Sequence, residues 1–214
     1  METVLLVADD IDERILRAAE VEFAEKGFYG AVVSDIADRA DVGKGTVYRH
    51  FGSKEELFAR IVENGVDDLL QGIEKNTRRL DDVEEKLKVV VAVHADMFKR
   101  SRHLVKIITH EGYGMMLEGK TDARRLFEKL IYSVAEIIEE GIETGQFKNV
   151  DIYRAARIYL GQLTSIVKAA ILFDEDNCSI DKDCSLFYQI FIDGLRGNGG
   201  KNIFLRSGSK NEPV

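Results

Sequence analysis

The segment from Gly43 to Lys54, GKGTVYRHFGSK, carries several hydrogen-bond donors and no acid. Its polar side chains can donate to phosphate oxygens or base edges of a nucleic acid: Lys44, Thr46, Tyr48, Arg49, His50 and Lys54. The whole chain has a formal net charge of −8, which argues against non-specific coating of nucleic acid. Contact with DNA would therefore come from this narrow strip. The alternative is that the strip is an ordinary solvated surface of a helical bundle.

A short helix over residues 44–51 is predicted to present these donors, with Gly43 as its cap. Val47 and Phe51 lie four residues apart, so both would face inward. The outward face would then hold Lys44, Gly45, Thr46, Tyr48, Arg49 and His50. A helix of about two turns is marginal alone, so packing must hold it.

Another short helix is predicted just before it, over residues 34–40. Ser34 is the expected N-cap, and Asp35 in the first turn suits the helix dipole. Asp41 follows, and Asp tolerates a left-handed backbone better than most residues. Two short helices joined by a tight turn make a helix-turn-helix.

Longer helices flank this pair. The first, over residues 11–26, has one apolar stripe and ends at Gly27, a favourable C-cap; the stripe is Ile11, Ile15, Ala19 and Phe23. After the pair, Ser53 with Glu56 three residues later predicts a capping box for a long helix to about residue 80.

The rest of the chain is predicted to be helical as well. Its only Pro is Pro213, and 45% of its residues are hydrophobic and 32% charged. Further helices are expected at about 82–100, 103–117, 121–144, 151–174 and 183–196. We therefore predict an all-α fold with a helix-turn-helix domain over residues 1–60 and a helical domain over 61–196. Residues 197–214, rich in Gly, Ser and Asn, are expected to be disordered.

No apolar run approaches the roughly 18 residues that span a membrane, so a cytoplasmic protein is expected. The cysteines Cys178 and Cys184 would then be reduced thiols. A redox switch between them is the alternative.

The first 60 residues resemble the DNA-binding domain of the tetracycline-repressor-like (TetR) transcriptional regulators. The resemblance rests on the stretch ILRAAEVEFAEKGFYGAVVSDIADRADVGKGTVYRHFGSKEELF. It implies that residues 44–51 are a recognition helix. Phosphate contacts are implied for Thr46, Tyr48, His50 and Lys54, and base contacts for Lys44, Gly45 and Arg49. Two positions depart from the family pattern, because Asp41 replaces the common Gly of the turn and Gly43 replaces Ser or Ala.

The same resemblance implies a ligand pocket within the helices from 82 to 174. Met and aromatic side chains with nearby polar groups suit adaptable pockets, although each alone is more typical of core packing. The candidates are His94, Met97, Phe98, His110, Tyr113, Met116, Tyr159 and Gln162. The basic run at 99–106 is either a solvated helix junction or a segment that attracts an anionic effector. We expect an organic effector, apolar with a polar or anionic end near that run.

Residues 152–173 contain a regular apolar series with spacings of 4, 3, 4, 3, 4 and 3, typical of a helix–helix seam. Its members are Ile152, Ala156, Tyr159, Leu163, Ile166, Ala170 and Phe173. An apolar helix with Leu186 and Ile190 follows, and both helices could belong to the internal core. The resemblance implies instead that the last two helices form a dimer interface through Tyr159, Leu163, Ile166, Ala170, Leu186 and Ile190.

The rival class is a helical ligand-binding or catalytic bundle with a vestigial helix-turn-helix. Di-iron bundles need Glu-x-x-His pairs, and no His in this chain has a Glu three residues earlier. We expect no catalytic residue, metal or cofactor. The preferred hypothesis is a homodimeric regulator, a repressor, that binds a palindromic operator and is released by a small organic effector.

Overall fold

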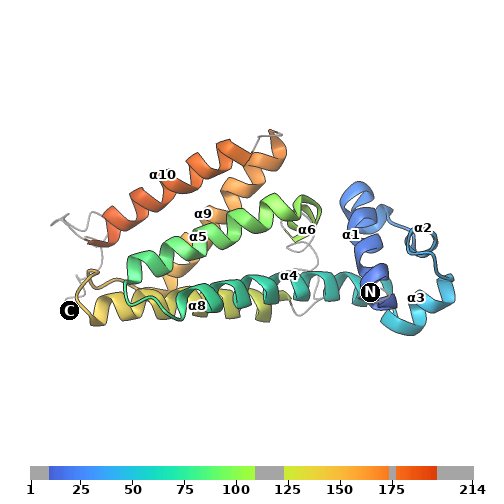
Figure 1. The fold of residues 1–214 in the computed structure, drawn as a ribbon, viewed down its shortest axis with the longest axis horizontal. Coiled ribbons are helices and arrows are strands. Elements are labelled where there is room, and N and C mark those ends of the chain that lie inside the picture. The colour runs from blue at the N-terminus through green and yellow to red at the C-terminus, as the bar shows by residue number, and fades with distance from the viewer. Residues whose placement is uncertain (1–9, 109–122, 174–176, 197–214) are drawn as a thin grey trace, which may run out of the picture.

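The computed structural model describes residues 10–108, 123–173 and 177–196. Every regular element in these ranges is a helix, which confirms the all-α prediction (Figure 1). The helices are α1 (Ile11–Gly30), α2 (Val33–Arg39), α3 (Lys44–Phe51), α4 (Lys54–Thr77), α5 (Val83–Arg100), α6 (Arg102–Lys106), α8 (Ala123–Glu143), α9 (Ile152–Leu172) and α10 (Asn177–Arg196). The tail at 197–214 and most of the helix predicted at 103–117 lie outside the described residues.

Two predicted helix starts are wrong. Ser34 is not an N-cap, because α2 already begins at Val33 and the capping position is Val32, which gives no side-chain hydrogen bond. The last helix begins at Asn177 rather than at residue 183. Its apolar stripe extends back to Ile180, which is buried with Cys184, so packing continues the helix through the acidic residues between them.

Helices α1–α3 form a head at one end of the molecule, and α4–α10 form a body (Figure 1). Three buried rings join the head to the start of α4. The centroids of Phe23 and Phe28 are 5.8 Å apart, and Phe58 of α4 lies 5.4 and 5.3 Å from them. Gly27 has a φ of 70°, which interrupts α1 and turns Phe28 back toward this cluster.

A buried carboxylate joins α1 to α2 inside the head. Glu22 is only 1% exposed, and its oxygens lie 2.6 Å from the Lys26 ammonium and 3.5 Å from the Arg39 guanidinium. A buried acid needs such cationic partners to offset its loss of hydration. The pairing therefore fixes the angle between α1 and α2.

Helix α4 begins in the head and runs the length of the body beside α8 (Figure 1). The predicted domain boundary at residue 60 therefore falls within one continuous helix. Helices α5, α9 and α10 cover the other side of the body. Among the described helices, none combines the length and apolarity needed to cross a membrane.

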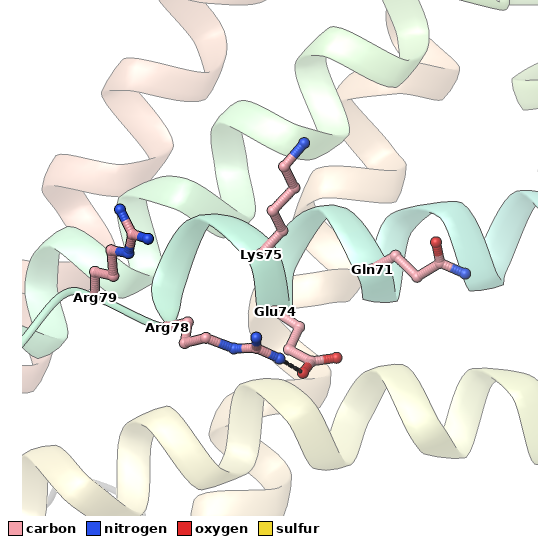
Figure 2. Close-up of a pocket in the computed structure, with 5 residues that line it drawn as sticks. All are labelled: Gln71, Glu74, Lys75, Arg78 and Arg79. Carbon is pink, nitrogen blue, oxygen red and sulfur yellow. Dashed lines mark hydrogen bonds and ion pairs between the residues drawn. The ribbon is translucent and has the colours of Figure 1, made fainter.

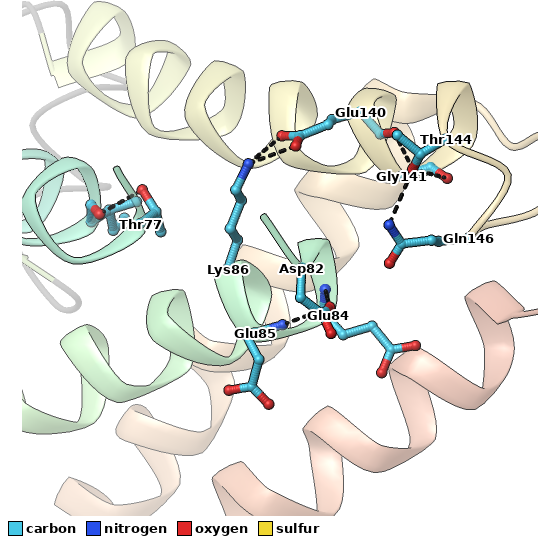
Figure 3. Close-up of polar contacts among 10 residues, drawn as sticks. Thr77, Asp82, Glu84, Glu85, Lys86, Glu140, Gly141, Thr144 and Gln146 are labelled. Atoms are coloured by element: carbon cyan, nitrogen blue, oxygen red, sulfur yellow. Dashed lines mark hydrogen bonds and ion pairs between the residues drawn. The ribbon is translucent and has the colours of Figure 1, made fainter. Parts of the chain in front are cut away.

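Polar contacts close the end of the body that lies away from the head (Figure 3). The Lys86 ammonium lies 2.6 Å from the Glu140 carboxylate and so links α5 to α8. Asp82 caps α5 by accepting from the Glu84 amide at 2.8 Å. The guanidinium of Arg196 pairs with the Glu84 carboxylate and joins the end of α10 to the start of α5.

The seam predicted along α9 is a contact within one chain. Tyr159 and Ala170 are 0% exposed and Leu163 is 1% exposed, so all three belong to the internal core. The Tyr159 hydroxyl donates to the Leu87 carbonyl of α5 at 2.7 Å. These three residues were therefore assigned wrongly to a dimer interface, because a fully buried side chain has no surface to offer a partner. Their periodic spacing reflects packing against α5 and α10.

Candidate nucleic-acid interface and ligand cavity

The turn between α2 and α3 is held by an arginine from α1. Asp41 adopts the left-handed backbone predicted for it, with a φ of 54°. The Arg14 guanidinium donates to the Ala40 carbonyl at 2.5 Å and to the Asp41 carbonyl at 2.9 Å. Arg14 thus fixes the turn that sets the direction of α3. Sequence reasoning missed it, because it lies 26 residues from its partner and its local context resembles any exposed helix position.

Helix α3 faces solvent along the predicted side. Gly43 is its N-cap, and Val47 and Phe51 are buried as predicted. Thr46 is half-buried, and the remaining predicted donors of this face are exposed: Lys44, Tyr48, Arg49 and His50. A Cβ added at Gly45 would meet nothing within 4 Å. Among the described residues, no neighbour requires glycine at this position.

An acid from α1 approaches one end of this face. Nδ1 of His50 lies 2.5 Å from an Asp12 carboxylate oxygen, although the two residues are 38 positions apart. The strip is therefore free of acids in sequence but not in space. A phosphate that binds His50 must share it with Asp12 or displace that carboxylate.

Lys54 has a structural role that its sequence context did not indicate. Its ammonium donates to the Phe28 carbonyl at 2.8 Å and the Ala31 carbonyl at 3.1 Å, and it lies 4.5 Å from the centroid of the Phe28 ring. The charge thus satisfies carbonyls at the end of α1. The adjacent N-cap prediction is confirmed, because Ser53 accepts from the Glu56 amide at 3.0 Å.

The body contains a cavity of about 690 Å³ between α5, α8 and α9. This volume lies within the usual range for sites of small organic ligands. Leu130 and Leu160 form an apolar floor, and the half-exposed rings of Tyr132 and Tyr153 meet edge to face with centroids 5.3 Å apart. Arg157 adds a cation to the lining.

His94 is a polar group on the α5 wall of this cavity. Its Nδ1 lies 2.7 Å from the Val90 carbonyl, so this nitrogen carries the proton. Burial lowers the pKa of His94 more than the Val90 hydrogen bond raises it. The ring is therefore neutral near neutral pH, and Nε2 is left as an acceptor.

The structure separates most of the other predicted ligand residues from this cavity. Phe98 and Tyr159 are buried in the core, and Met97 lines a small hollow of about 50 Å³ between α4, α5 and α6. Gln162 faces a groove between α9 and α10. Their assignment to one pocket with His94 is therefore wrong. The remaining candidates, His110, Tyr113 and Met116, lie outside the described residues.

The basic run at 99–106 is largely used by contacts within the chain. Lys99 pairs with Asp181 at 2.6 Å, and Arg100 pairs with Asp96 at 2.9 Å. The Lys106 ammonium donates to the Ala24 carbonyl of α1 at 2.6 Å. The expectation that this run attracts the anionic end of an effector is not supported, because these charges already have partners.

A further hollow of about 420 Å³ lies at the end of α4 (Figure 2). The Arg78 guanidinium bends back onto the Glu74 carboxylate at 2.6 Å. Lys75 and Arg79 point to the other side of the helix (Figure 2). Because these cations do not converge, the hollow does not form a single anion site.

An apolar groove of about 560 Å³ separates the outer faces of α9 and α10. Ile158, Leu186 and Ile190 line it and are 63%, 57% and 65% exposed. Large apolar side chains that gather on one exposed face mark an interaction surface. Leu186 and Ile190 were predicted for an interface and lie in this groove, and Ile166 lines its floor.

The described residues offer little for catalysis. They contain no group of three or more potential metal ligands. Cys184 is buried, and desolvation together with Asp181 and Asp183 raises the pKa of its thiol to about 11. A thiolate, which a nucleophile or a redox switch requires, is therefore disfavoured at neutral pH. The side chain of Cys178 lies outside the described part of the chain.

Comparison with known proteins decides the family. The pattern of "Bacterial regulatory proteins, tetR family" matches residues 15–61, and that of the "Tetracyclin repressor-like, C-terminal domain" matches residues 80–168. The transcriptional repressor NicS of Pseudomonas putida is 30% identical over 144 residues, which cover 66% of this chain and 68% of NicS. The chain belongs to the TetR family. It is a transcriptional regulator and not an enzyme.

Solved structures of TetR-type regulators share the fold. The fatty acid degradation regulator FadR of Bacillus halodurans matches with a TM-score of 0.79 and 26% identity, over 88% of this chain and 98% of FadR. FadR of Bacillus subtilis, solved in complex with stearoyl-CoA, matches with a TM-score of 0.78 and 22% identity, over 85% and 98%. The family membership makes the α2–α3 unit the DNA-binding helix-turn-helix.

Arg49 and Tyr48 should affect DNA recognition in different ways. Arg49→Ala should change which bases are preferred, at about 1–3 kcal/mol for each lost base contact. Tyr48→Phe should weaken binding to every sequence alike, because a phosphate contact carries no sequence information. Affinities for a set of single-base operator variants distinguish the two. An equal loss on every variant for Arg49→Ala would assign Arg49 to the phosphate contacts instead.

Arg14→Met should act through the turn. Loss of the two hydrogen bonds to the Ala40 and Asp41 carbonyls should cost about 1–3 kcal/mol of unfolding free energy. It should also weaken binding to all operator variants equally, because α3 loses its fixed direction. The matched control is Arg17→Met, since Arg17 pairs with Glu13 on its own helix. Urea unfolding and operator titration that show no difference between the two variants would rule out this role.

Proposed function

We propose that this TetR-family regulator binds a palindromic operator as a homodimer and is released from it by a small organic effector. Residues 1–60 would bind DNA, and residues 61–196 would bind the effector and dimerise. The observation that carries the proposal is the exposed donor face of α3, held by Arg14 on a rigid turn. We expect the protein in the cytoplasm, because a regulator that binds operator DNA must reach the chromosome there.

Repression is the expected mode of action. The relatives include repressors, such as NicS of Pseudomonas putida and KstR2 of Rhodococcus jostii, the latter 24% identical. They also include the activator FasR of Mycolicibacterium smegmatis, 25% identical. Release of DNA by a ligand suits a repressor, because ligand binding then restores transcription.

The cavity between α5, α8 and α9 is the proposed effector site. Its floor is apolar and its volume suits a small organic molecule. Matches to the fatty acid metabolism regulator of Bacillus subtilis, 24% identical, and to the Bacillus subtilis FadR structure with stearoyl-CoA support a ligand with an extended apolar part. An effector changes operator affinity only if it prefers one of two arrangements of the head and body.

The apolar groove of α9 and α10 is the proposed dimer surface. Two copies of this face would cover the exposed side chains Ile158, Leu186 and Ile190. A twofold dimer presents two recognition helices to one duplex, which strengthens binding by a head whose net charge is negative. The operator should accordingly be a palindrome with half-sites one helical turn apart.

Selection of bound duplexes from a random DNA pool tests the function. We expect enrichment of one palindromic sequence, because a twofold protein reads two equivalent half-sites. The Arg49→Ala protein, selected in parallel, should enrich a different or less defined sequence. Recovery of random sequences by the folded wild-type protein would contradict operator binding, and an asymmetric single site would contradict the dimer.

Charged substitutions on two faces of the last helices test the dimer. Leu186→Glu should give a folded monomer, because Leu186 contacts solvent in the single chain. Leu163→Glu should instead unfold the protein, since it puts an unpaired charge into the core. Analytical ultracentrifugation and circular dichroism measure both outcomes. A folded Leu186→Glu protein that remains dimeric would move the interface to another surface.

A further inference from the structure

We propose that the cavity between α5, α8 and α9 binds an apolar chain with an anionic head, a carboxylate or a phosphate. Arg157 would bind the head, and Gly161 would leave room for the chain on the α9 wall. The inference rests on the proposed function in so far as this cavity holds the effector. It adds the chemical class of the ligand and the two residues that select it.

Arg157 is an available cation on a mostly apolar lining. Arg154, one turn earlier on α9, pairs with Asp151 at 3.0 Å. Arg157 has no such ion-pair partner among the described residues, yet it lines the cavity. A guanidinium recognises carboxylates and phosphates through paired, directional hydrogen bonds. The charge is therefore placed to bind the anionic end of a molecule whose apolar part lies on Leu130 and Leu160.

The acid on the same lining does not favour a cationic ligand. Glu128 lies on α8 at the cavity and already has an interaction of its own within the protein. The neutral ring of His94 offers only an acceptor at Nε2, which suits a hydroxyl or amide group and adds no charge. Of the charged groups that the described residues bring to the cavity, Arg157 is thus the one without an interaction inside the protein.

Gly161 lies in the middle of α9, where glycine costs about 1 kcal/mol relative to alanine. Two other helix glycines, Gly141 and Gly72, have a steric reason within the protein. A Cβ at Gly141 would lie 2.2 Å from the Phe147 ring, and one at Gly72 would lie 3.0 Å from Val93. A Cβ at Gly161 would meet nothing within 4 Å, because the cavity lies in front of it. The space that this glycine leaves is space for the ligand.

These roles predict different responses to dodecanoate, dodecyl phosphate and dodecanol, measured by isothermal titration calorimetry at neutral pH. The wild-type protein should bind at least one anion more tightly than dodecanol, and the tighter anion identifies the head. Arg157→Met should lower the affinity for that anion by about tenfold or more, as expected for the loss of a charged hydrogen bond. The affinity for dodecanol should stay unchanged. Gly161→Leu should abolish binding of all three probes and keep the melting temperature at or above that of wild type.

Gly194→Leu is the matched control, because a Cβ at Gly194 also meets nothing within 4 Å but lies on α10, away from the cavity. It should bind all three probes like wild type. Three results would overturn the inference. The wild-type protein could bind the anions and dodecanol with equal affinity, or Arg157→Met could lower the affinities for both by the same factor. Gly161→Leu could also bind the probes with wild-type affinity.

Operator titration with the same proteins separates this inference from the proposed function. Without a probe, every cavity variant should bind the operator like wild type, since the substitutions lie outside the head. A wild-type protein that binds its operator but no anionic probe refutes the ligand class and leaves the DNA function standing. A protein whose anion binding depends on Arg157 but whose operator affinity is unaffected supports the site and refutes the proposed sensing.

Discussion

The contact between the end of α1 and the start of α4 determines how the head sits on the body. Lys54 donates to two carbonyls of the α1 end and lies over the Phe28 ring, and Phe58 completes the buried aromatic cluster one turn later. Because both contacts come from the first turns of one helix, the head cannot rotate without moving α4 or breaking them. Helix α4 has 24 residues in all, about 36 Å, and runs from this contact into the body.

A second contact fixes the head from the side. The Lys106 ammonium of α6 donates to the Ala24 carbonyl of α1, so the head is held at two points by two different helices. Helix α4 also packs on α8, which forms one wall of the proposed effector cavity. In the proposed function, a ligand that moves α8 would act on the recognition helix through α4, and the α6 contact would be the second point that holds the head. This arrangement gives a physical route for linkage between the two sites.

Local signals were sufficient to predict the helix-turn-helix. The caps at Gly43 and Ser53, the left-handed Asp41 and the inward pair Val47 and Phe51 all depend on residues a few positions apart. The seam on α9 was misassigned because its period describes packing but not the packing partner. The charges of the basic run were misread for a similar reason, since Lys99 finds Asp181 only in the folded chain. The cavity walls come from three helices, so neither Arg157 nor Gly161 has a local signature.

The most direct test of operator recognition is an equilibrium titration of the selected palindrome and of a scrambled duplex of equal length at one fixed salt concentration. We expect two protomers to bind one palindrome at least about 10³-fold more tightly than the scrambled duplex, the usual lower range for specific DNA recognition. Equal affinity for the two duplexes would show that the donor face of α3 contacts only the DNA backbone and would contradict the proposed role of this chain.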